Sequence, residues 1–313
     1  MSASEGGGSA GGDVDGDGVD GSCLCGGVRY RATGQSLGPV WFCHCEHCRK
    51  TSSTAFATWL ACDCESFHWH AGEALVSHYR TSTGLRRAFC SVCRSVLPAE
   101  QAARRRIWLP VGGLNRNAPG VVAPRPEFHT FVDSKAPWFE IADPLLCYAQ
   151  SRDDAGEEAL GSESRRAAPA PDDLPETVEG SCLCGATSYR MSGVLDRMRS
   201  CQCSRCRRST GSGFFVGIRG TPEHFVLQGD ERHITTWTLP GTRFFVVRFC
   251  TTCGCLVPGL PGEGYTVLSA GTLDKDPGLR LRCHIHWASK AAWIELSDGL
   301  PRFDAFPPDS FPS

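Results

Sequence analysis

Residues 43–56, CHCEHCRKTSSTAF, decide the fold, because they recur as CQCSRCRRSTGSGF at residues 201–214. Each copy of this CxCxxC stretch is preceded by a CxC and followed by a CxxC, in the same order and at nearly constant separation. The chain is therefore predicted to be a tandem duplication of one metal-binding domain. Fourteen of the nineteen cysteines belong to the repeat: Cys23, Cys25, Cys43, Cys45, Cys48, Cys90 and Cys93, then Cys182, Cys184, Cys201, Cys203, Cys206, Cys250 and Cys253.

The length of 313 residues also suits two domains of the usual ~100–200 residues each. Residues 1–20 are rich in Gly and Asp and are predicted to be a disordered tail, since they cannot bury enough apolar surface to fold. The first domain is placed at 21–148 and the second at 179–308, followed by a short tail at 309–313. Residues 149–178 carry mixed charges and an Ala-Pro-Ala-Pro section, and are predicted to be a stiff linker that could hold the copies apart.

Composition narrows the function classes. The chain is 41% hydrophobic and 21% charged with a net charge of −2, and no apolar run reaches the ~20 residues of a membrane span. Neither a membrane nor a nucleic acid is favoured as a partner, and the basic run 104–106 is interpreted as a solvated turn. The N-terminus lacks the features of a secretory signal, so we expect a cytoplasmic location, where thiols act as ligands or nucleophiles before they form disulfides.

Short apolar runs bounded by Gly, Pro or Asp predict strands in both copies, for example at 28–32, 244–249 and 265–269. No long amphipathic helix is evident, so the fold is expected to be mainly β. Residues i and i+2 of a strand point to the same face, so a CxC on a strand could hold one ion from a sheet edge. A CxxC at a tight turn can do the same. Each CxC is therefore predicted to join the distant CxxC of its own copy.

Together, the CxC and CxxC of one copy offer four thiolates, which fill the tetrahedral shell of Zn²⁺ and leave no position for a substrate. Such a site is predicted to be structural, with metal binding coupled to folding. Unligated buried cysteines would leave the repeated spacing unexplained, and an odd cysteine count disfavours a disulfide framework. An iron–sulfur cluster is the main rival to zinc. The predicted ligands are Cys23, Cys25, Cys90 and Cys93 in the first copy and Cys182, Cys184, Cys250 and Cys253 in the second.

The CxCxxC is different in kind, because three thiolates from one short loop leave the fourth tetrahedral position open. Three protein ligands with an exchangeable fourth is the arrangement of catalytic zinc. The competing interpretation is a second structural site closed by another side chain. The available side chains do not correspond between the copies, which favours the open position. The predicted ligands are Cys43, Cys45 and Cys48, and Cys201, Cys203 and Cys206; the candidates for closing the site are His44, His47, Cys62, Cys64 and Cys147, and Cys255 and Cys283.

Longer motifs surround these cysteines. The first copy contains GSCLCGGVRY at 21–30, CHCEHCRKTSSTAF at 43–56, FCSVCRS at 89–95 and HTFVDSKAPW at 129–138. In the second copy GSCLCGATSY, CQCSRCRRSTGSGF, FCTTCGCLVPG, AGTLD and HIHWASKAAW follow in the same order. Both copies resemble the glutathione-dependent formaldehyde-activating family, which also includes centromere protein V.

This resemblance implies two tandem domains of a mainly antiparallel fold called the β-tent, each with a four-cysteine structural zinc and a second zinc on the CxCxxC, or four zinc ions per chain. It also implies a carbon–sulfur lyase, named for joining glutathione and formaldehyde into S-hydroxymethylglutathione. An open zinc could lower the pKa of a bound thiol or polarise the aldehyde oxygen. Another small thiol or aldehyde, a thiol-binding module without turnover and a protein-interaction module all remain open.

Glutathione has two carboxylates, so the cations directly after each CxCxxC are candidate partners, or they offset the charge of the metal centre. His129 and His284 align within an HxxxxSKAxW pattern and are either proton shuttles or hydrogen-bonded core histidines. Trp138 and Trp293 of the same pattern are expected in the core. The candidate cations are Arg49, Lys50, Arg207 and Arg208.

Two glycines of the second copy are replaced in the first: Ser53 stands where Gly211 does, and Arg94 where Gly254 does. Glycine at these positions indicates a backbone conformation that other side chains tolerate poorly. The second copy also has Gln202 in place of a histidine. Neither copy has lost a predicted ligand, so both are expected to bind two ions.

Overall fold

The computed structural model describes residues 18–115, 125–152, 159–193, 195–220, 224–242, 245–259, 264–308 and 310–311. Most of the predicted N-terminal tail lies outside these ranges. Its last three residues, 18–20, belong to the first strand, so the ordered domain begins earlier than expected. The prediction of a mainly β fold is confirmed: strands dominate, and the described residues contain two α-helices of seven residues each.

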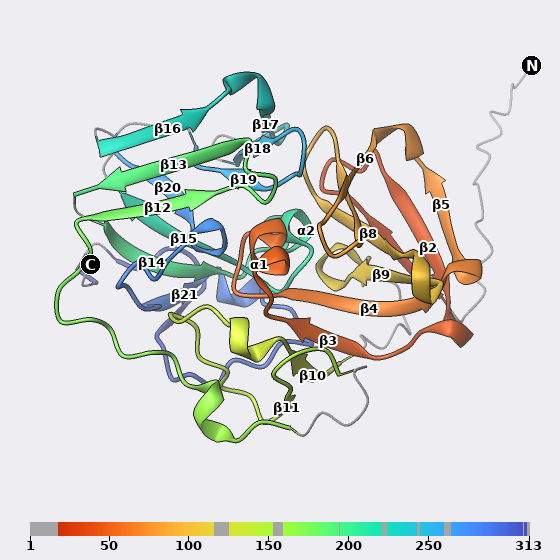
Figure 1. Cartoon of the computed structure of the whole chain (residues 1–313), viewed down its shortest axis with the longest axis horizontal. Helices are drawn as coiled ribbons and strands as arrows, with labels where there is room; N and C mark the ends of the chain where they lie inside the picture. Colours follow the sequence, from red (N-terminus) through yellow and green to blue (C-terminus); the bar gives the residue numbers. More distant parts are fainter. Residues whose placement is uncertain are drawn as a thin grey trace, which may run out of the picture.

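The first domain has a small and a large sheet (Figure 1). The small sheet has the order β1-β2-β5, and the large one β11-β10-β3-β4-β9-β8-β7-β6. Pairing is antiparallel except where β10 joins β3 and β11. The elements are β1 Gly18–Ser22, β2 Arg29–Thr33, β3 Val40–Cys43, α1 Glu46–Ser52, β4 Ala57–Asp63, β5 Phe67–Ala71, β6 Val76–Arg80, β7 Arg86–Cys90, β8 Val96–Gln101, β9 Arg106–Pro110, β10 Pro126–Thr130 and β11 Leu146–Cys147.

The second domain repeats this plan with a divided large sheet. Its sheets have the orders β12-β13-β16, β20-β15-β14-β21-β22 and β17-β18-β19. The counterparts of β19 and β20 in the first domain, β8 and β9, are paired. The elements are β12 Thr177–Ser181, β13 Thr187–Ser192, β14 Leu195–Cys201, α2 Ser204–Thr210, β15 Phe215–Gly220, β16 Phe225–Gly229, β17 Ile234–Thr238, β18 Val246–Cys250, β19 Leu256–Val257, β20 Thr266–Ser269, β21 Cys283–Ile285 and β22 Arg302–Phe303.

Strand alternation in β4 separates two cores. Successive residues face opposite sides of a sheet, so Leu60 points into the main core while Trp59 points into a smaller one that includes Cys43 and Cys48. The main core continues from one domain into the other. The predicted strands at 28–32 and 265–269 correspond to β2 and β20; that at 244–249 corresponds to β18, and its first residue lies outside the described residues.

In each domain, a turn that contains a glycine packs against the end of the cysteine-bearing helix of the other domain. The amide of Gly112 donates to the carbonyl of Gly211 beyond α2 (2.9 Å), and a Cβ at Gly112 would lie 2.4 Å from the carbonyl oxygen of Ser212. Gly271 occupies the equivalent place beyond α1, where a Cβ would lie 2.3 Å from the amide of Thr54. Glycine is needed at both contacts because nothing larger fits. As a result, α1 and α2 lie side by side between the domains (Figure 1).

The expectation that the linker holds the copies apart is wrong, because the domains share a core and the linker packs along them. Leu160 donates its amide to the carbonyl of Cys147 (2.7 Å), and Ile141 donates to that of Arg165 (2.8 Å). Arg280 of the second domain binds the carbonyl of Ala168 within the proline-containing section (2.7 Å). The linker therefore follows the surface of both domains.

The predicted unusual backbone at the two glycine positions is confirmed. Gly211 and Gly254 have φ of 68° and 72°, and Ser53 and Arg94 adopt nearly the same values, 60° and 59°. The first domain thus keeps the same turns as the second, although a positive φ is sterically unfavourable for Ser53 and Arg94.

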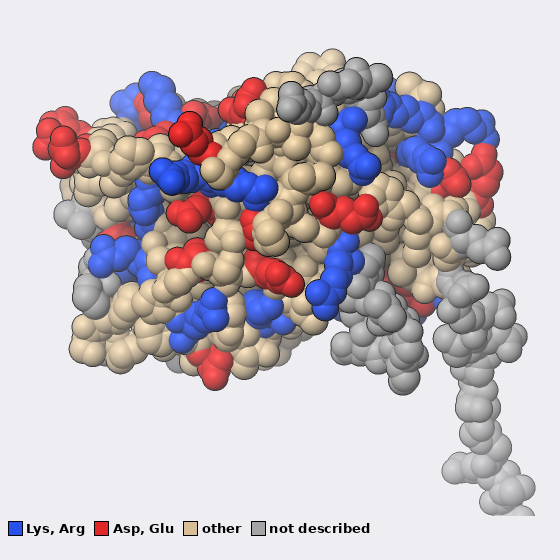
Figure 2. All heavy atoms as spheres, turned by 90° about the horizontal axis from the view of Figure 1, so that it is seen from below, with Lys and Arg blue, Asp and Glu red and all other residues tan. Residues whose placement is uncertain are grey.

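On the face shown in Figure 2, basic and acidic side chains are interspersed. The run 104–106 forms an exposed turn, as interpreted, in which Arg105 pairs with Glu65 and Arg106 with Asp63 (2.8 Å). Within the described ranges, no helix has the length and apolar character needed to cross a membrane.

Candidate metal centres

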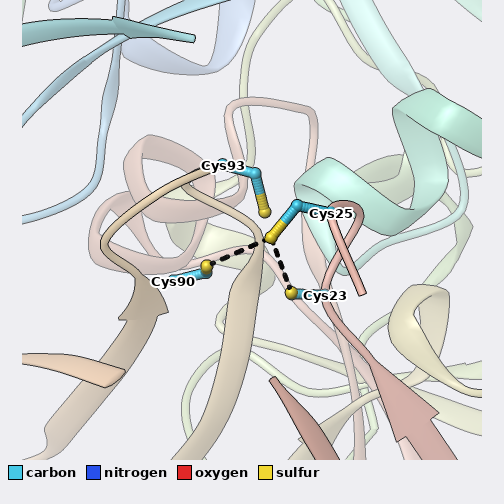
Figure 3. A group of neighbouring side chains, drawn as sticks. All are labelled: Cys23, Cys25, Cys90 and Cys93. Carbon is cyan, nitrogen blue, oxygen red and sulfur yellow. Dashed lines mark hydrogen bonds between the residues drawn. The ribbon is translucent and has the colours of Figure 1, made fainter. Parts of the chain in front are cut away.

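Two turns of the first domain bring four sulfur atoms together (Figure 3). The Sγ atom of Cys25 lies 3.3 Å from that of Cys23 and 3.8 Å from that of Cys90, and with Cys93 all four lie within 4.8 Å of one another. The CxC was expected on a strand but lies in the turn after β1. There, the amide of Val28 donates to the Cys23 sulfur (3.2 Å), which folds the chain back on itself.

The second domain repeats this centre with Cys182, Cys184, Cys250 and Cys253, whose sulfur atoms again lie within 4.8 Å of one another. One neighbour differs. The hydroxyl of Ser95 accepts the amide of Leu24 in the first domain (2.9 Å), whereas the Cys255 sulfur accepts that of Leu183 in the second (3.4 Å). Cys255 therefore supports the turn from outside the four-sulfur group.

The sulfur spacing fits a tetrahedral ion and not a disulfide. At a Zn–S distance of about 2.3 Å, two ligands of a tetrahedron are about 3.8 Å apart, whereas bonded sulfurs are about 2.05 Å apart. The adjacent sulfurs in both four-cysteine groups lie 3.3–3.8 Å apart, and every cysteine of the chain is free. The donor sets thus suit zinc.

The first three-cysteine centre forms where β3 meets α1. Cys43 ends β3, Cys45 is the N-cap of α1, and Cys48 lies in its first turn. The Cys45 sulfur accepts the amide of Cys48 (3.4 Å) and lies 3.6 Å from the sulfur of Cys43. The cap therefore orients the chain so that all three sulfurs lie within 4.8 Å of one another.

Two large side chains contact Cys48 from within the protein. A guanidinium nitrogen of Arg87 lies 3.2 Å from its sulfur, and the indole nitrogen of Trp59 lies 3.5 Å from it. Both donors are buried. Hydrogen bonds from the thiols of Cys43 and Cys45, followed by the charge of Arg87, hold the pKa of Cys48 well below its usual value. The same thiol contacts raise the pKa of Cys43 and Cys45, so negative charge at this centre is favoured on Cys48, next to Arg87.

The second three-cysteine centre has the same ligands and different surroundings. Its sulfurs, from Cys201, Cys203 and Cys206, lie within 4.8 Å of one another, and all three residues are partly exposed. The register of the equivalent strands places Gly217 where Trp59 stands, and alignment of the two CxxC motifs places Val247 where Arg87 stands. The ligand set is therefore duplicated, whereas the buried donors are not.

Comparison with known proteins agrees with this duplication. The model of the family "Glutathione-dependent formaldehyde-activating enzyme" matches residues 18–134 and again 177–289. The chain belongs to this family. A relative from Halomonas elongata, named for glutathione-dependent formaldehyde activation, is 30% identical over 128 residues, which cover 38% of this chain and 80% of the relative. A crystal structure of a Rhodobacter sphaeroides protein aligns at 19% identity over 32% of this chain and 91% of that chain, with a TM-score of 0.28.

In this member of the formaldehyde-activating family, no fourth His, Cys, Asp or Glu among the described residues joins either three-cysteine group. His44 turns away from the sulfurs, with its Nε2 2.8 Å from Nδ1 of His129. The other side chains considered for closing the site are also outside the groups: His47, Cys62, Cys64, Cys147, Cys255 and Cys283.

The candidate cations Lys50 and Arg208 lie at the interface between the domains. The ammonium of Lys50 is buried between the domains, 2.6 Å from both Ser181 and Asp274 of the second domain. Arg208 makes the reciprocal contacts with Ser22 (3.2 Å) and Asn115 of the first domain. These cations bind the opposite domain because their helices face it, which sequence spacing did not indicate.

The preceding cations are also turned inward. Arg207 donates to the carbonyls of Gln202 (2.9 Å) and Ser289, tying the cysteine loop to the following segment. Arg49 is partly buried, and desolvation lowers the pKa of its guanidinium. Their positions favour support of the cysteine loops over direct contact with a substrate.

The histidines and tryptophans of the HxxxxSKAxW pattern lie in the core. His129 and His284 are each 1% exposed and bind Asp143 (3.0 Å) and Asp298 (3.0 Å). These contacts fit the interpretation of hydrogen-bonded core histidines. Trp138 and Trp293 are 3% and 5% exposed, as expected of core residues.

Arg94 lies between the two four-cysteine centres and was not recognised as part of either. It is 0% exposed and donates to the carbonyl of Thr51 (2.6 Å). Burial lowers its pKa to about 10, against the raising effect of the thiol charges of Cys255, Cys93 and Cys253. A buried guanidinium needs negative neighbours, and four-thiolate zinc centres in both domains would provide them.

Proposed function

We propose that the chain is a zinc-dependent carbon–sulfur lyase that joins glutathione, or a similar small thiol, to formaldehyde or another small aldehyde. The observation that carries this proposal is the group of Cys43, Cys45 and Cys48, in which three sulfurs within 4.8 Å have no fourth protein ligand among the described residues. Four further thiolates in each domain suit a structural ion. The expected content is two zinc ions per domain and four per chain.

Zinc bound to the three cysteines would supply a Lewis acid able to stabilise a thiolate or polarise an aldehyde oxygen. The chain's own residues prepare this site. Arg87 and Trp59 donate to the Cys48 sulfur and fix its orientation. Because both donors are buried, water is excluded from this side of the centre, which strengthens their effect on charge.

The proposed reaction adds the thiol across the aldehyde. A carbon–sulfur bond forms, the carbon–oxygen π bond breaks, and the thiol proton ends on the new hydroxyl oxygen. No oxidant or reductant is needed. The reverse reaction breaks the same carbon–sulfur bond. The role of the protein is thus to hold the thiol as its more nucleophilic anion beside the aldehyde.

The test is the initial rate of S-hydroxymethylglutathione formation from glutathione and formaldehyde, measured above the uncatalysed rate with the zinc-loaded full chain. The double variant Cys48→Ser/Cys206→Ser should reduce the rate to background. Cys64→Ser, a cysteine outside all four groups, is the control and should keep the wild-type rate. Equal rates with and without wild-type protein would refute the lyase, and glutathione binding in calorimetry would then favour a thiol-binding module.

A further inference from the structure

A pocket of about 360 Å³ lies on the first domain, lined in part by Trp41 of the strand that ends at Cys43. This volume is within the range of about 300–1,000 Å³ found for small-ligand sites. It is lined by an aromatic wall, formed by Trp41, Trp108 and Phe128, and by three arginines, Arg104, Arg106 and Arg152. Among the described residues that line it there is no Asp or Glu, although Arg106 is paired with Asp63. The pocket therefore combines an apolar wall with positive charge.

The wall continues the sheet face that carries Cys43. Trp41 precedes Cys43 by two residues on β3, so both point to the same face, about 7 Å apart along the strand. Thr130, which also lines the pocket, is paired with Cys43 on the neighbouring strand. Trp41 and Trp108 pack against the small core that contains Cys43 and Cys48. A ligand that reaches the cysteines along this face would thus pass over the aromatic wall.

Of the arginines that line the pocket, Arg152 lies nearer to the level of Cys43 along the sheet, and Arg106 lies farther from it. The guanidinium of Arg152 lies 4.5 Å over the ring of Phe128, which is paired with Trp41. Arg106 is paired with Asp63, at the far end of β4, and shares an ion pair with it (2.8 Å). At about 3.3 Å per residue, this end of the strand is about 20 Å from the level of Cys43. The pocket therefore favours an elongated ligand with anionic groups away from its sulfur.

The second domain lacks this aromatic wall. Strand register places Arg199 where the first domain has Trp41, Val267 in place of Trp108 and Cys283 in place of Phe128. Trp59, which joins the wall to Cys48, is replaced by Gly217. At these described positions the second domain thus has no aromatic ring in place of those of the first.

We infer that this pocket binds the part of glutathione that carries its two carboxylates, with Arg152 holding one carboxylate over the aromatic wall. This inference rests on the proposed function. The first domain is then the thiol-binding half of the chain. The three-cysteine centre of the second domain serves mainly to support the cysteine-bearing helix α2 against the first domain.

The inference is tested by calorimetry of the zinc-loaded full chain with S-methylglutathione, which keeps both carboxylates and has no free thiol. Arg152→Gln should raise the Kd about ten-fold, as expected for a lost charge-assisted hydrogen bond. Trp108→Val, which introduces the residue of the second domain, should also weaken binding. The matched control is Arg219→Gln, which removes an arginine stacked 4.7 Å over Tyr265 on the second domain and should leave the Kd unchanged.

The pocket assignment is overturned if wild-type protein does not bind S-methylglutathione, or if Arg152→Gln and Arg106→Gln together leave the Kd unchanged. It is equally overturned if Arg219→Gln weakens binding as much as Arg152→Gln does. These outcomes differ from failure of the lyase. A chain that binds S-methylglutathione through Arg152 but does not accelerate formaldehyde addition would keep the pocket and lose the proposed reaction.

Discussion

The two three-cysteine centres share their ligands and differ in almost everything around them. In the first, Arg87 and Trp59 donate to Cys48 from buried positions, and the pocket adjoins the same sheet face. In the second, valine and glycine stand at those positions and all three cysteines are partly exposed. The comparison teaches that the duplication kept the three cysteines in both copies, whereas Arg87 and Trp59 of the first copy correspond to Val247 and Gly217 in the second.

Single ligand substitutions should separate the two centres most strongly. Cys48→Ser is expected to reduce the rate of S-hydroxymethylglutathione formation by ~100-fold or more, since losing a ligand costs more than the 10–100-fold typical of losing a residue that supports one. Cys206→Ser should leave the rate nearly unchanged, because the second centre is not expected to receive the thiol. Rates are measured with the zinc content of each variant. A larger loss in Cys206→Ser would reverse the assignment of roles.

The next largest effect is expected from making the first centre resemble the second. Arg87→Val removes the guanidinium 3.2 Å from the Cys48 sulfur and should lower kcat/KM about ten-fold, as for other residues that orient a metal ligand. Arg87→Lys, which keeps the charge, should recover part of the loss. If Arg87→Val retains both its zinc and the wild-type rate, the buried donor has no role in the chemistry.

At the domain interface, a substitution in one domain is expected to disturb the cysteine-bearing helix of the other domain. Gly271→Ala in the second domain would place a Cβ 2.3 Å from the amide of Thr54, next to α1, whereas Gly112→Ala in the first domain would disturb α2. Each should cost about 1–3 kcal/mol of unfolding free energy through overpacking. Activity should fall further in Gly271→Ala, although it lies outside the proposed active domain. Equal activity in the two variants, at equal stability, would argue against functional asymmetry.

A smaller effect is expected for the buried arginine between the four-cysteine centres. Arg94→Gly keeps the positive φ of 59° but removes the charge, so zinc should pass to a chelator a few-fold faster from both centres. The reason is that the thiolates lose a buried counter-charge. Arg94→Lys is the control that retains the charge. Unchanged zinc transfer in Arg94→Gly would mean that Arg94 does not stabilise charged centres.

The smallest effect concerns Lys135 in the first domain. Burial lowers its pKa from 10.5 to about 8 in the folded protein. Between these values the unfolded chain binds the additional proton, so stability should rise with pH from about 8 to about 10.5. Lys135→Met should lack this part of the rise, measured as the Tm difference from wild type across the range. A difference that does not depend on pH would contradict the lowered pKa.

Much of the arrangement was predictable from cysteine spacing, and the missing parts have physical reasons. Repeated spacing is enough to group fourteen thiols into four sets, because each set lies in one or two short turns. Glycine at 211 and 254 signalled the backbone that Ser53 and Arg94 also adopt. The CxC was misplaced on a strand because the amide–sulfur bond of Val28 that folds its turn has no sequence signature.

Contacts between the domains were the part that sequence spacing could not provide. Lys50 and Arg208 were candidates for binding a substrate or offsetting the charge of the metal centre because they follow metal-binding loops, yet their partners come from the opposite domain. Arg87 was missed because nothing in its own segment marks it as a neighbour of Cys48. Its replacement by Val247 in the repeat was the one available signal.

The central claim is that the first three-cysteine centre, and not the second, receives the thiol. A crystal structure of the zinc-loaded chain with glutathione tests it most directly. The account predicts four zinc ions, with glutathione density extending from Cys43, Cys45 and Cys48 over Trp41 toward Arg152, and none at Cys201, Cys203 and Cys206. A protein side chain closing the first centre, or glutathione at the second centre alone, would contradict it.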